Sequence, residues 1–98
     1  MLKLRFAAGG YDRLDALQYG IVQPEGIELE FNEINAPRRI FDGMLGGGLF
    51  DVSEFSSSEF ITRTLRGDFP FVGIPVFPSK AFRHGFIYIN KHAGITSP

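Results

Sequence analysis

The sequence of 98 residues contains no cysteine, and this absence excludes several kinds of chemistry. A chain without thiols forms no disulfide, offers no thiolate nucleophile and builds no cysteine-ligated zinc cluster. Chains free of disulfides are typical of reducing compartments. We therefore expect a cytoplasmic protein.

Excess charge of one sign and long apolar runs are also missing. The formal net charge is −1 with both signs interspersed, so no basic face could neutralise a run of phosphates, and we expect no nucleic-acid partner. No uninterrupted apolar segment approaches the roughly 20 residues that a membrane helix needs. The first residues also lack the apolar core of a signal peptide. We expect no association with a membrane.

What is present predicts one small folded domain. Hydrophobic residues make up 44% of the chain and charged residues 21%, which is typical of soluble globular proteins. A chain of 98 residues can support one hydrophobic core but not two. We predict one domain over residues 1–98.

The spacing of apolar residues alternates between the period of a strand and that of a helix. Apolar and charged residues that take turns, as in "IELEF", predict strands, whereas apolar residues three or four apart predict helices. The expected strands cover residues 2–7, 27–31, 49–55, 69–77 and 86–90, and the expected helices cover residues 11–20, 37–45 and 56–66. This order predicts an α/β fold with a mainly parallel sheet and helices on both faces.

The last residues, "GITSP", are typical of the start of a helix. Thr96 or Ser97 would supply a capping hydroxyl before Pro98. The predicted sheet also lacks elements that would cover its last edge. We therefore expect a partial α/β domain, completed either by more chain or by a partner copy, with a possible homo-oligomer through the uncovered sheet edge.

Ligands of open α/β sheets bind beyond the carboxyl ends of the strands, so the loops that follow strands are the candidate sites. The first such loop, "GGYDR", offers Tyr11, Asp12 and Arg13 at a predicted helix start, where an anion is favoured. The alternative is structural, with Asp12 as a cap and Arg13 in solvent. The pattern leaves both open.

The second loop, "SEFSSSEF", places Glu54 at a strand end and three serines at a helix start. Ser56, Ser57 and Ser58 could cradle carboxylate or phosphate oxygens. Ser56 and Glu59 also stand at the spacing of a capping box, which would explain these two residues without any ligand.

The third loop, "FPSKAFRHG", gathers two cations, a histidine and a hydroxyl after an apolar run. Arg83 can bind a carboxylate through two N–H groups, and His84 can exchange a proton near neutral pH. Ser79 and Lys80 add a hydroxyl and a second positive charge. No spacing of acidic residues or histidines supports a metal site, and we expect neither a metal nor a cofactor.

Several segments together resemble the 4,5-dihydroxyphthalate decarboxylase-like family. They include "QPEGIELEF", "FDVSEFSSSEF" and, most specifically, "PVFPSKAFRH". The resemblance covers nearly the whole chain and implies the N-terminal portion of a longer protein, related to the type 2 periplasmic solute-binding proteins, in which two α/β lobes close on a cleft. The present chain would then be the first part of lobe one. The family implies loss of carbon dioxide from a dihydroxylated aromatic dicarboxylate.

The chemistry of that reaction suggests roles for the candidate residues. An acid protonates the ring carbon, and cations hold the retained carboxylate. The catalytic candidates are His84 and Glu54, and the substrate-binding candidates are Tyr11, Arg13, Ser56, Ser57, Ser58, Ser79, Lys80 and Arg83. The sequence leaves open whether the protein is a cofactor-independent carboxy-lyase, a solute-binding lobe for a small anionic aromatic ligand, or an inactive fragment.

Overall fold

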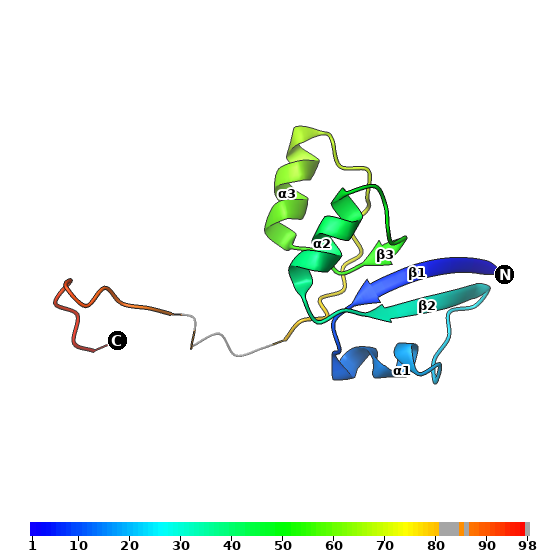
Figure 1. Cartoon of the computed structure of the whole chain (residues 1–98), viewed down its shortest axis with the longest axis horizontal. Coiled ribbons are helices and arrows are strands. Elements are labelled where there is room, and N and C mark those ends of the chain that lie inside the picture. The colour runs from blue at the N-terminus through cyan, green and yellow to red at the C-terminus, as the bar shows by residue number, and fades with distance from the viewer. Residues whose placement is uncertain (81–84, 86, 98) are drawn as a thin grey trace.

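The computed structural model describes residues 1–80, 85 and 87–97. These residues contain a three-stranded parallel sheet with the strand order β2-β1-β3 (Figure 1). The strands are β1 (Leu2–Ala8), β2 (Ile27–Glu33) and β3 (Val52–Ser53), and the helices are η1 (Asp12–Leu14), α1 (Asp15–Gln18), α2 (Pro37–Leu45) and α3 (Ser57–Arg66). The predicted partial α/β domain with a mainly parallel sheet is confirmed.

The strand order places helices on both faces of the sheet. The chain moves one way from β1 to β2 and the opposite way from β2 to β3, so two right-handed crossovers put α1 and α2 on opposite faces. Figure 1 shows α1 below the strands and α2 and α3 above them. All three strands end at the same edge, and the loops that follow them therefore meet there.

The core lies between β1 and α2. Ala7 of the central strand and Ile40 of the helix are fully buried, and Met44 and Phe50 pack beside them. Pro37 occupies the first turn of α2, as its fixed φ and missing N–H favour. The small side chain at Ala7 lets the helix approach the sheet closely.

The prediction of a buried strand over residues 69–77 is wrong, because these residues form no helix or strand. Pro70 and Pro75 lack the N–H that a central strand must donate to the ladder. The segment packs instead through aromatic rings: the ring centroids of Phe55 and Phe69 are 5.2 Å apart, and those of Phe60 and Phe69 are 5.6 Å apart. These distances are typical of favourable aromatic pairs.

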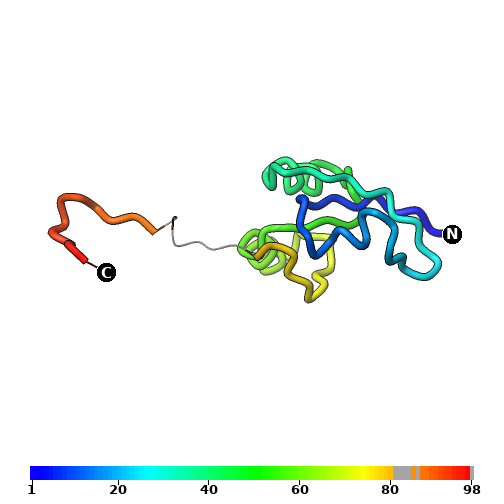
Figure 2. Tube along the Cα trace, turned by 90° about the horizontal axis from the view of Figure 1, so that it is seen from below, coloured from blue at the N-terminus to red at the C-terminus, as the bar shows by residue number. Residues whose placement is uncertain are grey.

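The predicted strand over residues 86–90 is also absent from its described part, because residues 87–90 have no regular structure. Residues 87–97 lie apart from the sheet in both views (Figures 1 and 2). The predicted strand over residues 49–55 shortens to the two residues of β3. None of the described helices has both the length and the apolar character that crossing a membrane requires.

An ion pair fastens the short edge strand to the central one. The guanidinium of Arg5 donates to both carboxylate oxygens of Asp51, from Nε at 3.0 Å and from Nη2 at 2.9 Å. The main-chain N–H of Arg5 donates to the same carboxylate at 2.8 Å. These hydrogen bonds lower the pKa of Asp51 from 3.8 to about 2.

We expect that Asp51→Asn makes the protein less stable near neutral pH and less sensitive to acid. Because the pKa of Asp51 is lowered by folding, its contribution is present above 3.8 and is lost as the pH falls toward 2. The measurement is urea unfolding followed by circular dichroism across this pH window. Asp68→Asn, at an exposed aspartate, is the control. Equal pH dependence in the parent and in Asp51→Asn would contradict the assignment.

A second prediction concerns the core. Ile40→Ala should lower the free energy of unfolding by about 2–5 kcal/mol, because it leaves a cavity under α2. Ile61→Ala removes the same atoms from a side chain that is 57% exposed, and it should cost about 0.5 kcal/mol or less. Chemical denaturation of the two variants provides the comparison. Similar losses in both would show that α2 does not cover the core.

Candidate functional site

The loops after β1 and β3 meet through Tyr11 and Glu54. The phenol of Tyr11 donates to Oε2 of Glu54 at 2.8 Å, and the main-chain N–H of Gly9 donates to Oε1 at 3.0 Å. Tyr11 and Glu54 are both partly buried. The two predicted site residues, 43 residues apart in the sequence, therefore form one polar cluster at the carboxyl edge of the sheet.

Local backbone structure explains why the ring lies there. Tyr11 is extended, with φ −99° and ψ 137°, and turns its side chain back over the end of β1. A Cβ on Gly9 would come within 3.2 Å of the Tyr11 ring. The absence of a side chain at Gly9 therefore leaves room for the Tyr11 ring beside the main chain, from where its hydroxyl reaches Glu54.

The surroundings of Tyr11 raise its pKa above the ordinary value of 10.0. Burial of the phenol is the largest cause, followed by its hydrogen bond to Glu54 and by the negative charge of that carboxylate. The hydroxyl of Ser79 and the charge of Arg13 act in the opposite direction. Ser79 and Arg13 are both predicted substrate-binding residues, and both act on the phenol in the direction that favours its ionised form.

Arg13 is occupied within the protein. Its Nε donates to the carbonyl of Pro78 at 3.1 Å, and its Nη2 donates to the same oxygen. Its Nη1 lies 3.8 Å from Oδ1 of Asp12. Arg13 is exposed, as the structural alternative predicts, and its guanidinium also joins the first loop to the third.

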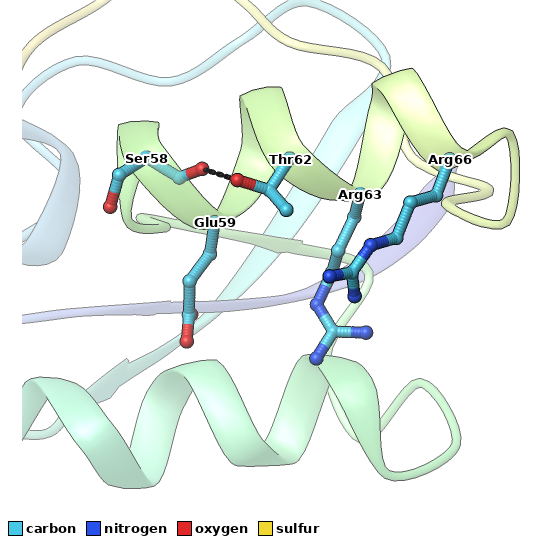
Figure 3. Close-up of a pocket in the computed structure, with 5 residues that line it drawn as sticks. All are labelled: Ser58, Glu59, Thr62, Arg63 and Arg66. Atoms are coloured by element: carbon cyan, nitrogen blue, oxygen red, sulfur yellow. Dashed lines mark hydrogen bonds between the residues drawn. The ribbon is translucent and has the colours of Figure 1, made fainter.

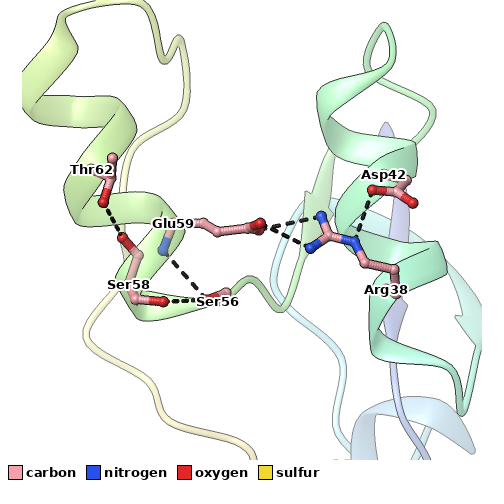
Figure 4. A network of polar contacts seen from close by, with 6 residues as sticks. All are labelled: Arg38, Asp42, Ser56, Ser58, Glu59 and Thr62. Atoms are coloured by element: carbon pink, nitrogen blue, oxygen red, sulfur yellow. Dashed lines mark hydrogen bonds and ion pairs between the residues drawn. The ribbon is translucent and has the colours of Figure 1, made fainter.

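The serines of the second loop begin α3. Ser56 is the N-cap and accepts from the N–H of Glu59 at 3.4 Å, and its hydroxyl lies 3.0 Å from that of Ser58 (Figure 4). Ser57 is exposed. The capping role predicted for Ser56 is confirmed, and the cradle for an anion stays a prediction.

The other half of the predicted capping box is replaced by an ion pair. The carboxylate of Glu59 binds Arg38 at 2.8 Å and 3.3 Å, and Arg38 also donates to Asp42 at 2.9 Å (Figure 4). This network connects α3 to α2. Sequence reasoning missed Arg38 as a connecting residue, because its partner Glu59 is 21 positions away and no local pattern marks the pair.

The remaining candidates divide into one exposed residue and two that are not described. Lys80 is exposed, and no hydrogen bond or ion pair joins it to another described residue. Arg83 and His84 lie outside the described residues. The roles predicted for all three stay predictions.

Asn35 is a residue of the edge that sequence reasoning missed. Its Oδ1 accepts the main-chain N–H of Gly10 at 2.8 Å. Asn35 lies two residues after the end of β2, in a loop that the search of loops after strands could also have included. The loop after β2 thus supports the loop that carries Tyr11.

Two shallow hollows lie elsewhere on the molecule. The first, of about 250 Å³, runs along α3, where Arg63 and Arg66 lie side by side (Figure 3); it is lined by Ser58, Glu59, Thr62, Arg63 and Arg66. The second, of about 320 Å³, borders the aromatic cluster at Phe69 and Phe71. Neither includes Tyr11, Arg13 or Glu54. Within the described part of the chain, no three acidic or histidine side chains are grouped as a metal site would require.

The structure is an open parallel α/β sheet with a phenol and a carboxylate beyond its strand ends, the edge at which sheets of this class bind ligands. Over 97 residues, 99% of its length, the chain is 38% identical to a 4,5-dihydroxyphthalate decarboxylase of Comamonas testosteroni. It is also 38% identical, over 98% of its length, to a 4,5-dihydroxyphthalate decarboxylase of Pseudomonas putida. No family model matches the chain. The resemblance predicted from the sequence is confirmed, and the chain spans 29% and 37% of these two relatives.

The pairing of Tyr11 with Glu54 can be tested by titration. Glu54→Gln removes the negative charge that disfavours tyrosinate, so the pKa of Tyr11 should fall. Ultraviolet absorbance of tyrosinate gives the value in a Tyr19→Phe, Tyr88→Phe background, which leaves one tyrosine. Glu25→Gln, in the turn before β2, is the control. An unchanged Tyr11 pKa in Glu54→Gln would contradict the pairing.

Proposed function

We propose that the chain forms part of the ligand-binding wall of a 4,5-dihydroxyphthalate decarboxylase-like protein, a lyase that removes carbon dioxide from an aromatic dicarboxylate. The observation that carries the proposal is the Tyr11–Glu54 pair at the carboxyl edge of the sheet. The names of the two relatives support the reaction. The cytoplasmic location predicted from the sequence fits such an enzyme and belongs to the same proposal.

The reaction exchanges a carboxylate for a proton on the aromatic ring. An acid delivers a proton to the ring carbon that bears the carboxylate, the bond to that carboxylate then breaks, and its electron pair returns to the ring as carbon dioxide leaves. A hydroxyl para to this carbon supplies electron density during protonation. Any protein group that accepts a hydrogen bond from that hydroxyl strengthens its electron release.

The Tyr11–Glu54 pair is suited to accept hydrogen bonds from ring hydroxyls. Each carboxylate oxygen of Glu54 already accepts one bond and has capacity for another. The proton of the Tyr11 hydroxyl is directed to Glu54, so the lone pairs of its oxygen can accept hydrogen bonds. In this proposal Glu54 accepts hydrogen bonds, and a different residue donates the proton to the ring carbon.

The remaining roles in the proposal come from side-chain chemistry. His84 delivers the proton to the ring carbon, because imidazole exchanges protons near neutral pH. Arg83 binds the retained carboxylate through two N–H groups. Lys80 and the serines at the start of α3 add positive charge and hydroxyl donors along the same edge.

Binding measurements should show a preference for ring hydroxyls. Each lost hydrogen bond to a charged group is worth about 1.5–3 kcal/mol, so the chain should bind 4,5-dihydroxyphthalate roughly tenfold or more tighter than phthalate. Glu54→Ala should remove most of this preference, whereas Glu25→Ala should leave it unchanged. Isothermal titration calorimetry measures both ligands. A preference that survives Glu54→Ala would remove the pair from the site.

Release of carbon dioxide separates the lyase from a solute-binding protein. The Comamonas testosteroni relative, assayed beside the chain, is the positive control. Under the lyase proposal, His84→Gln abolishes release while binding persists, and Arg83→Ala weakens binding. Tight binding of 4,5-dihydroxyphthalate without release by a protein of the relatives' full length that carries this chain would overturn the proposed lyase activity and favour a solute-binding function.

A further inference from the structure

The contact between Arg13 and Pro78 joins two segments that are 65 residues apart. Two N–H groups of the guanidinium converge on one main-chain carbonyl, a contact that the planar fork of arginine makes and a lysine cannot reproduce. The side chain of Arg13 is 42% exposed, so the contact lies at the surface of the edge.

Few other hydrogen bonds hold the described residues 76–80 in place. Pro75 and Pro78 have no N–H for a sheet ladder, and the one main-chain hydrogen bond of this stretch runs from Val76 to Ile74. Among the described residues, the hydrogen bonds that join the stretch to the rest of the chain are those that Arg13 donates to the carbonyl of Pro78. Figure 1 shows the segment passing the carboxyl ends of β1 and β2.

We propose that Arg13 is a positioning residue, which holds the carbonyl of Pro78 and thereby keeps the next residue, Ser79, near the loop that carries Tyr11. The groups that face this phenol are Glu54 from the loop after β3, Ser79 from the held segment and Arg13 from its own loop. The positioning role of Arg13 does not depend on the proposed function, because the contacts involve no ligand. Only the relevance of Arg13 to substrate binding rests on the proposed function.

The assignment changes what Arg13 does at the site. Its two converging N–H groups serve Pro78 and are not available to a substrate carboxylate. Its effect on Tyr11 then has two parts: a direct one from its charge and an indirect one through Ser79. Both parts lower the pKa of the phenol. Removing Arg13 should therefore abolish the effect of Ser79 as well as its own.

A double-mutant cycle separates the two parts. The sequence has no tryptophan and three tyrosines, so the Tyr19→Phe, Tyr88→Phe background reports Tyr11 alone in ultraviolet titration. Ser79→Ala and Arg13→Ala should each raise the pKa of Tyr11, and the double variant should match Arg13→Ala. Arg13→Lys, which keeps the charge but loses the fork, should match Ser79→Ala. Additive effects would overturn the proposal.

Proteolysis supplies a second measurement without any ligand. Lys80 lies two residues beyond the held carbonyl and is a trypsin site. Cleavage after Lys80 should be faster in Arg13→Ala and in Arg13→Lys, while Ser79→Ala and the control Arg39→Ala should keep the parent rate. An unchanged rate in both Arg13 variants would overturn the proposal.

Circular dichroism checks that each variant is folded. If Arg13→Ala does not fold, the cleavage rates of Arg13→Lys and Ser79→Ala decide the test. Because neither assay uses a ligand, failure to bind 4,5-dihydroxyphthalate would count against the proposed function alone.

Discussion

The attachment of β3 to β1 is the constraint on which the rest of the structure depends. The ladder between them is only two pairs long, Phe6 with Val52 and Ala7 with Ser53. Side chains extend it at both ends: Asp51 binds Arg5 before the ladder, and Glu54 binds Gly9 and Tyr11 after it. Polar contacts thus supply much of what a longer strand would supply through its backbone. The same contacts that complete the sheet also place the carboxylate of the candidate site.

A second layer of packing begins at Phe55, directly after Glu54. Its ring contacts Phe41 of α2 at 5.3 Å and Phe69 at 5.2 Å, and Phe69 continues to Phe60 of α3. The Arg38–Glu59 ion pair bridges the same two helices at the surface. The aromatic rings therefore direct the segment after α3 back across the sheet edge, where Pro78 meets Arg13.

Local patterns predicted the elements well where the physics is local. The alternation of apolar and charged residues from Ile27 onward correctly predicted β2, because one face of that strand is more buried than the other. Ser56 gave the start of α3, because a cap bonds to an N–H three residues away. The rule that parallel strands end at one edge also brought Tyr11 and Glu54 together correctly.

Non-local contacts account for what the sequence could not predict. Residues 69–77 have the composition of a buried strand, but their rings find partners on α3 and their prolines prevent pairing. The partner of Arg13 is a main-chain carbonyl, and any residue type could have supplied it. No residue pattern marks such an acceptor, so the role of Arg13 in holding Pro78 was not foreseen.

The brevity of β3 also has a consequence for motion. A strand held to β1 by two ladder pairs, two flanking main-chain hydrogen bonds and a few side-chain contacts can open at a lower free energy than β1 and β2, which share seven pairs. Tyr11 follows the stable pair of strands, while Glu54 follows the strand that opens first. A local opening of β3 would therefore separate Glu54 from Tyr11 while β1 and β2 stay paired.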